Sequence, residues 1–101
     1  ASLAIQTKST RLYFGCHAGD AAIYNDCRRE FMQAIGKAIV LADDWRVRLH
    51  FPFIDMQKSE IAQLGTKLGV PYEDTWTCYE GGDEPCGLCG ACTERELALG
   101  S

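Results

Sequence analysis

The apolar positions between residues 11 and 51 change from a short continuous run to a helical stripe and then to a strict alternation. The run from Arg11 to Cys16 is apolar and aromatic, which predicts a buried strand. Asn25 and Asp26 are residue types that cap helices, so we expect a helix to begin there. The apolar positions that follow have the spacings of three and four that a helix needs, and they are Phe31, Ile35, Ala38, Ile39 and Ala42.

A second strand and a second helix come next. Apolar residues alternate with basic ones over residues 46–51, which predicts a strand that Pro52 ends. A helix is expected over residues 57–68, and Gly69 is a natural residue for its C-terminal end. The core face of this helix, set by helical spacing, consists of Ile61, Leu64 and Leu68.

The order strand, helix, strand, helix predicts an α/β protein with a parallel sheet. Two strands alone do not make a stable open sheet, so we expect more sheet in a preceding segment or in a partner chain. Residues 1–10 show no period and are assigned to a linker or to the end of a preceding segment, and residues 11–72 to an α/β portion. Residues 73–101 form a cysteine-rich tail that ends in a short helix over residues 93–99.

The charge of the chain narrows its class. The chain has 101 residues, a formal net charge of −4 and a pI near 5.0. An acidic chain with scattered Lys and Arg argues against a nucleic-acid partner. No apolar run approaches the roughly 20 residues of a membrane-spanning helix, and the first residues lack the layout of a signal peptide. We therefore expect a cytoplasmic protein that binds neither membrane nor nucleic acid.

Four of the six cysteines gather in the tail with the spacing C-x7-C-x2-C-x2-C. Cysteines separated by two residues form a tight turn that directs two sulfurs at one ion, and four thiolates complete a tetrahedral zinc shell. Gly87 and Gly90 follow two of these cysteines, where such a turn often needs a positive φ. Because a filled shell leaves no position for water, we expect a structural zinc. The expected ligands are Cys78, Cys86, Cys89 and Cys92.

Two other interpretations of the cysteines stay open. Disulfides are one, although cysteines this close rarely pair with each other and no export signal is present. An iron–sulfur cluster is the other, although no Cys-Pro pair follows Cys92 as it does in bacterial ferredoxins. Cys16 and Cys27 lie outside the tail and are expected to be buried. The first turn of a helix would, however, favour a thiolate at Cys27.

Three segments form an ordered set of motifs. The first is Asp20 with the run of residues 24–31, YNDCRREF, and the second is residues 51–61, FPFIDMQKSEI. The third is residues 75–95, which contain TWTCYEGG, PCGLCGAC and a final ER. This combination, which covers residues 11–99, resembles the 7-cyano-7-deazaguanine synthase family.

The resemblance implies an ATP-dependent C–N ligase of queuosine precursor biosynthesis, which converts 7-carboxy-7-deazaguanine and ammonia to 7-cyano-7-deazaguanine. It also implies a Rossmann-like fold of the PP-loop ATP pyrophosphatase type, a homodimer, and ATP with magnesium as co-substrate. The family's phosphate loop, Ser-Gly-Gly-x-Asp-Ser, has no match in this chain. We therefore expect residues 1–101 to be the C-terminal part of such an enzyme and to be inactive alone.

The resemblance also selects contacts for substrate or ATP, but it assigns no catalytic residue. A carboxylate at Asp20 accepts hydrogen bonds from a guanine-like edge or holds magnesium, whereas an ordinary loop acid is only solvated. Arg28 can bind a carboxylate or phosphate through two hydrogen bonds, or pair with an acid close in sequence. Lys58 has the same two options. The full set is Asp20, Tyr24, Asp26, Arg28 and Lys58.

A non-catalytic zinc-ribbon module that binds another protein is the alternative function. The acidic loop with Glu80, Asp83 and Glu84 lies between the first two tail cysteines and suits that role. An iron–sulfur electron carrier is a third option, which iron content and visible absorbance would distinguish from a colourless zinc protein.

Overall fold

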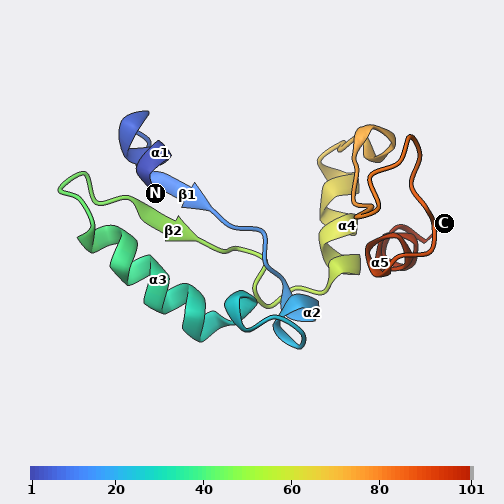
Figure 1. Ribbon diagram of the computed structural model, residues 1–101, viewed down its shortest axis with the longest axis horizontal. Helices are drawn as coiled ribbons and strands as arrows, with labels where there is room; N and C mark the ends of the chain where they lie inside the picture. Colours follow the sequence, from blue (N-terminus) through green and yellow to red (C-terminus); the bar gives the residue numbers. More distant parts are fainter. Residues whose placement is uncertain (101) are drawn as a thin grey trace. The chain divides into compact units, whose positions relative to one another are not determined.

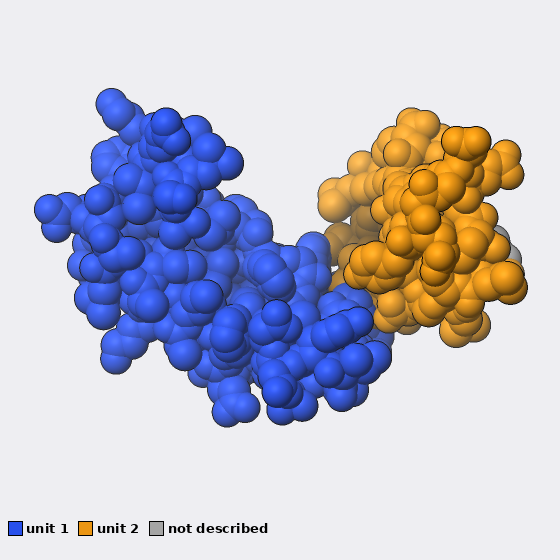
Figure 2. Space-filling view, viewed as in Figure 1, with its two compact units in different colours: residues 1–57 blue, residues 58–101 orange. Residues whose placement is uncertain are grey.

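Figure 1 shows the computed structural model of the chain, which describes residues 1–100. The chain forms two compact units, which Figure 2 draws in different colours: the first is residues 1–57 and the second begins at Lys58. From the cysteine content we expected a division after residue 72. The observed division comes earlier because the helix that starts at Lys58 packs against the last helix of the chain.

The first unit is built around two short parallel strands, β1 (Arg11–Tyr13) and β2 (Arg48–His50). Their register pairs Leu12 with Leu49. Helix α3 (Arg29–Leu41) connects the strands and contacts β2 (Figure 1). This parallel strand–helix–strand arrangement confirms the predicted α/β class. The smaller elements of the unit are α1 (Ser2–Gln6), α2 (Ala18–Ala21) and the 3-10 turn η1 (Asn25–Cys27).

The core of the first unit is small. Cys16, Met32 and Ile54 form its buried cluster, and Cys16 is only 2% exposed, which confirms its predicted burial. Met32 is the buried residue of α3, whereas Phe31 and Ile35 of the predicted stripe remain 39% and 38% exposed. Neighbouring strands lie only about 4.8 Å apart, so two strands are too narrow to cover the full apolar stripe of a helix.

The second unit consists of two helices and the segment between them. Helices α4 (Lys58–Lys67) and α5 (Gly90–Leu99) pack against each other, and the 3-10 turn η2 (Tyr72–Asp74) follows α4. Gly69 has a φ of +76°, as expected for the residue that ends the helix before it. The Tyr72 hydroxyl donates a hydrogen bond of 2.7 Å to the Ala62 carbonyl of α4.

Arg95 fastens α5 to the segment that precedes the cysteine loop. Its Nη1 donates to Thr75 Oγ1 at 2.8 Å, and its Nη2 donates to the Tyr72 carbonyl at 2.6 Å. Because Tyr72 is itself bonded to α4, these contacts connect α5, η2 and α4 through an unbroken set of hydrogen bonds. The cysteine loop is therefore held at both ends by one framework.

The starts of two predicted helices and the predicted linker are corrected. Helix α3 begins at Arg29 rather than Asn25, because Arg28 is extended and separates the helix from the 3-10 turn before it. Helix α5 begins at Gly90, earlier than the predicted start at residue 93. A helix also occupies Ser2–Gln6 in the predicted linker, where five residues are too few to show a period. None of the helices within residues 1–100 combines the length and hydropathy that a membrane span requires.

Candidate metal centre

Four cysteine side chains converge around the start of α5. The Sγ atoms of Cys78, Cys86, Cys89 and Cys92 all lie within 4.8 Å of one another, and those of Cys86 and Cys92 are 4.0 Å apart. Four sulfurs bound to one zinc at about 2.3 Å would stand about 3.8 Å apart at the corners of a tetrahedron. The chain therefore brings the four predicted ligands together with a spacing that suits one tetrahedral ion.

The loop from Cys78 to Cys86 wraps around the Cys78 sulfur. This Sγ accepts hydrogen bonds from the backbone N–H groups of Glu80 and Cys86, both at 3.4 Å. Gly81 has a φ of +73°, in the left-handed region that glycine adopts without strain, so it lets the loop turn back. The Trp76 indole N–H donates to the Cys78 carbonyl at 2.8 Å and fixes the backbone at the first ligand.

The turn from Cys86 to Cys89 supplies the second set of N–H groups. The backbone N–H groups of Leu88 and Cys89 donate to Cys86 Sγ at 3.3 and 3.2 Å. Gly87 has a φ of +73°, which agrees with the conformation expected for this turn. Gly90 has no positive φ, contrary to expectation, because it is already the first residue of α5.

Helix α5 starts on the cysteine cluster itself. Cys89 is its N-cap residue, and Cys89 Sγ accepts a hydrogen bond of 3.4 Å from the Cys92 backbone N–H. The positive end of the helix dipole therefore faces the sulfurs and favours thiolates there. This cap also explains why α5 begins earlier than predicted, since cysteine is not among the usual capping residues.

Backbone N–H groups lower two of the thiol pKa values. Hydrogen bonds from the backbone at Tyr79 and Cys92 lower the pKa of Cys89 to about 6, from an ordinary value of 9.0. The two N–H groups that bond the Cys78 sulfur lower the pKa of that thiol as well. Without metal, negative charge is therefore favoured at Cys89 and Cys78.

Cys92 differs from these two thiols. A backbone hydrogen bond at Gly87 lowers its pKa, but burial and hydrogen bonds with the three neighbouring cysteines outweigh this and raise the pKa to about 12. The metal-free cluster thus keeps a proton at Cys92 among groups that favour negative charge. A divalent cation would take the place of that proton and neutralise the charge that the sulfurs share.

The donor set decides what this centre does chemically. Cys78 and Cys92 are buried while Cys86 is exposed, so one side of the cluster faces the interior of the second unit and the other lies near its surface. Four protein sulfurs fill a tetrahedral shell and leave no open position for a reactive water. All six cysteines of the chain are free thiols, which gives the disulfide interpretation no support. The cluster fits a metal ion with a structural role.

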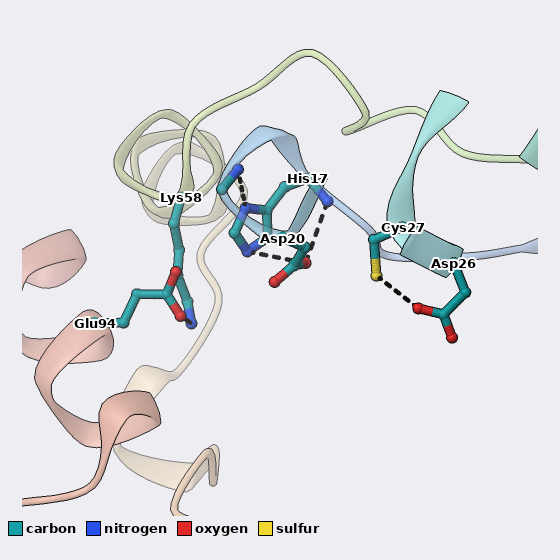
Figure 3. A network of polar contacts seen from close by, with 7 residues as sticks. His17, Asp20, Asp26, Cys27, Lys58 and Glu94 are labelled. Atoms are coloured by element: carbon teal, nitrogen blue, oxygen red, sulfur yellow. Dashed lines mark hydrogen bonds and ion pairs between the residues drawn. The ribbon is translucent and has the colours of Figure 1, made fainter. Parts of the chain in front are cut away.

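Asp20, a candidate residue of the first unit, interacts with His17, to which we assigned no role from the sequence. His17 is buried and caps the short helix α2: its Nδ1 accepts from the Gly19 N–H at 3.1 Å. In return the His17 backbone N–H donates to Asp20 Oδ2 at 3.4 Å, and His17 Nε2 lies 3.2 Å from the same oxygen (Figure 3). The His-x-x-Asp spacing is the signal for this reciprocal capping box.

The other candidates of the first unit lie on the neighbouring turn. Tyr24 is 52% exposed, and Asp26 Oδ1 accepts a hydrogen bond of 3.8 Å from the Cys27 thiol (Figure 3). Arg28 Nε donates to the Ala21 carbonyl at 3.1 Å, so this arginine binds backbone rather than an acid close in sequence. Because α2 contacts η1, the structure groups Asp20 with these residues.

Cys27 is not an activated thiol. Burial, followed by the nearby carboxylates of Asp20 and Asp26, raises its pKa. The expectation that a helix dipole would favour its thiolate is therefore wrong, because Cys27 lies in the 3-10 turn before α3 and not in the first turn of that helix. The expected burial is only partly met, since Cys27 packs against the core but is not fully enclosed.

Lys58 belongs to the second unit and has an ion-pair partner far away in sequence. Its Nζ lies 3.0 Å from Oε2 of Glu94 in α5 (Figure 3). A pair with an acid close in sequence was the alternative that we considered for this lysine. The observed partner depends instead on the packing of α4 against α5, which no local pattern reveals.

Comparison with known proteins agrees with the motifs. The family model "Queuosine biosynthesis protein QueC" matches residues 1–101. A protein of Caldicellulosiruptor saccharolyticus named 7-cyano-7-deazaguanine synthase is 50% identical over 94 residues, 93% of this chain and 42% of that protein. Proteins of the same name from Archaeoglobus fulgidus and Porphyromonas gingivalis are 49% and 41% identical over 98% of this chain, and 42% and 45% of their own lengths. The chain therefore spans less than half of these curated relatives, and it belongs to the QueC family of queuosine biosynthesis proteins.

Proposed function

We propose that this chain is the zinc-bearing part of an ATP-dependent ligase that makes 7-cyano-7-deazaguanine from 7-carboxy-7-deazaguanine and ammonia. The four-cysteine cluster at the start of α5, in a chain that the family model matches throughout, carries this proposal. In the reaction that the resemblance implies, ATP adenylates the carboxylate, ammonia gives an amide, and a second activation removes water to leave the nitrile. The relatives are named for that product.

The proposed metal is zinc, and its role is structural. Cys78, Cys86, Cys89 and Cys92 hold it. Four N–H···S hydrogen bonds of the two loops and a fifth at the α5 cap shape the site before the metal binds. Such a centre contributes on the order of 10 kcal/mol to the order of its loop. In this chain that contribution fixes the N-terminus of α5 and therefore the position of α5 on α4.

The proposed substrate contacts of the first unit are Asp20, Tyr24, Asp26 and Arg28. Both contacts of His17 with Asp20 use Oδ2, so Oδ1 is the oxygen that we assign to the amino and amide edge of the deazaguanine or to magnesium. Arg28 is held through Nε, which leaves both terminal nitrogens for a carboxylate or phosphate. The exposed ring of Tyr24 supplies a stacking surface.

The complete enzyme that we propose has a Rossmann-like nucleotide-binding sheet to which β1 and β2 contribute. The parallel pairing of these strands and the exposed apolar side chains of α3 support this, because both call for further strands beside them. The phosphate loop that holds ATP has no counterpart in residues 1–101 and would lie elsewhere in the longer protein. A homodimer in the cytoplasm, as the resemblance implies, completes the proposal.

A chimeric enzyme tests this function. This chain would replace the matching segment of the Caldicellulosiruptor saccharolyticus synthase, to which it is 50% identical. We expect ATP-dependent formation of the nitrile by the chimera and none by residues 1–101 alone. Asp20→Asn or Arg28→Gln in the chimera should raise the KM for the 7-carboxy substrate. A correctly folded, zinc-loaded chimera that forms no nitrile would refute the proposal.

A zinc-ribbon module that binds another protein is the second candidate. Two large apolar side chains on the metal loops favour it, since Tyr79 is 85% exposed and Leu88 is 89% exposed. The loop acids Glu80, Asp83 and Glu84 would select a basic partner. Leu88→Ser separates the two functions: it should abolish partner binding if the chain is an adaptor, and leave nitrile synthesis by the chimera unchanged if it is part of the enzyme.

A further inference from the structure

The ion pair between Lys58 and Glu94 joins the first residue of α4 to the helix that begins at the metal centre. Lys58 Nζ and Glu94 Oε2 are 3.0 Å apart, and the two side chains are 30% and 44% exposed. A pair this accessible adds little to folding stability. The main effect of this ion pair is to hold the Lys58 ammonium in one position.

The position of Lys58 makes this partner necessary. An ammonium in the first turn of a helix meets the positive end of the helix dipole, which disfavours a cation there. The Glu94 carboxylate offsets that repulsion. Without it, the flexible four-carbon side chain of Lys58 gains by turning away from the helix end into solvent.

The metal centre in turn places Glu94. Helix α5 has 10 residues, fewer than the roughly 12 to 15 that an isolated helix needs in water, so its first turn depends on its cap and its packing. That cap is Cys89, and Cys92 lies in the first turn. Glu94 follows Cys92 by two residues, and its neighbour Arg95 is bonded to the segment before the cysteine loop.

We propose that Glu94 is a positioning residue through which metal loading of the cysteine cluster fixes the Lys58 ammonium at the start of α4. The ammonium keeps about a third of its side chain accessible and is presented to an anionic group of the substrate, a phosphate or a carboxylate. This deepens the proposed function and rests on it for the identity of that group. The cysteine cluster then does more than stabilise the fold, since it also determines the position of a positive charge at the start of α4.

Chemical labelling of lysines tests the link in the zinc-loaded chain. Acetylation with an N-hydroxysuccinimide ester, followed by mass spectrometry, gives the labelling of Lys58 relative to Lys67, an exposed lysine in the last turn of α4. We expect Glu94→Gln to raise this ratio by about 1.5- to 5-fold, the range that loss of a half-exposed ion pair allows. The matched control is Glu96→Gln, which neutralises an exposed acid of the same helix and should leave the ratio unchanged.

Metal removal completes the test. A chelator should raise the labelling of Lys58 relative to Lys67 in the unmodified chain. It should raise this ratio little further in Glu94→Gln, because that variant has already lost the ion pair. An unchanged ratio in Glu94→Gln with zinc retained, or an equal rise in both proteins on chelation, would overturn the inference. In the chimera, Glu94→Gln should raise the KM more than it lowers kcat, for ATP if the group is a phosphate and for the 7-carboxy substrate if it is a carboxylate. Absence of ATP-dependent activity in the unmutated chimera would instead count against the proposed function.

Discussion

Gly65 of α4 faces the ring of Tyr72, and an alanine there should destabilise the second unit. A Cβ atom at Gly65 would overlap the Tyr72 hydroxyl oxygen and lie 2.9 Å from Cζ, closer than side-chain atoms approach. The Tyr72 hydroxyl is held by its 2.7 Å hydrogen bond to the Ala62 carbonyl. The ring therefore has to move, and the hydrogen bond that links η2 to α4 is lost when it does.

The expected loss of stability in Gly65→Ala is the sum of three effects. Glycine to alanine in a helix interior normally stabilises by about 0.5 to 1 kcal/mol. Loss of the Tyr72 hydrogen bond costs about 0.5 to 1.5 kcal/mol, and forcing an extra methyl group into a packed contact costs about 1 to 3 kcal/mol. Gly65→Ala should therefore lower the stability of the second unit by about 0.5 to 4 kcal/mol, the reverse of the usual sign.

Gly36 provides the matched control in α3. A Cβ there would lie 3.5 Å from the Leu49 Cβ, an ordinary contact, so Gly36→Ala should stabilise by about 0.5 to 1 kcal/mol. Hydrogen exchange of the zinc-loaded chain, read by mass spectrometry on α3 and α4 peptides, reports each helix separately. Equal or greater protection of α4 in Gly65→Ala would refute the packing of Tyr72 on this helix.

Three further predictions concern the metal loop and its anchors. Cys89→Ser removes both a ligand and the α5 cap, so zinc affinity should fall steeply and α5 should lose its exchange protection, whereas Cys16→Ser should leave the zinc content unchanged. Arg95→Lys should destabilise α5 by about 1 to 3 kcal/mol, since one ammonium cannot reproduce the two bonds to Thr75 and Tyr72; exchange protection of α5 equal to that of the unmodified chain would contradict this. Without metal, the lowered pKa values of Cys89 and Cys78 give a stabilisation that is complete above pH 9 and is lost as pH falls, through about 6 for Cys89. The raised pKa of Cys92 gives a stabilisation that is complete below pH 9 and is lost as pH rises through about 12. The helicity of the reduced, metal-free chain should therefore be greatest near pH 9, and a maximum below pH 7 would contradict these assignments.

Local patterns predicted the elements whose signals are local. The helical stripe and Gly69 gave α3 and the end of α4, and the alternation before Pro52 gave β2. The start of α3 was misplaced because Arg28 is extended, a backbone state that good capping residues before it concealed. The start of α5 was misplaced because a cysteine sulfur takes the place of the usual cap.

The metal cluster could be predicted from the sequence because most of its signal is also local. Cys86, Cys89 and Cys92 are brought together by a single turn and the first turn of a helix, so their spacing carries the geometry. The ion pair of Lys58 with Glu94 joins residues 36 apart in sequence and depends on helix packing. No periodic pattern contains that information, and the same holds for the two bonds of Arg95.

X-ray absorption at the zinc edge, recorded on the natively purified, reduced chain together with its metal content, tests the central claim most directly. The account predicts one zinc per chain with four sulfur neighbours at about 2.3 Å and no nitrogen or oxygen neighbour. Iron with visible absorbance, a shell with fewer sulfurs, or cysteines oxidised to disulfides in the native protein would contradict it.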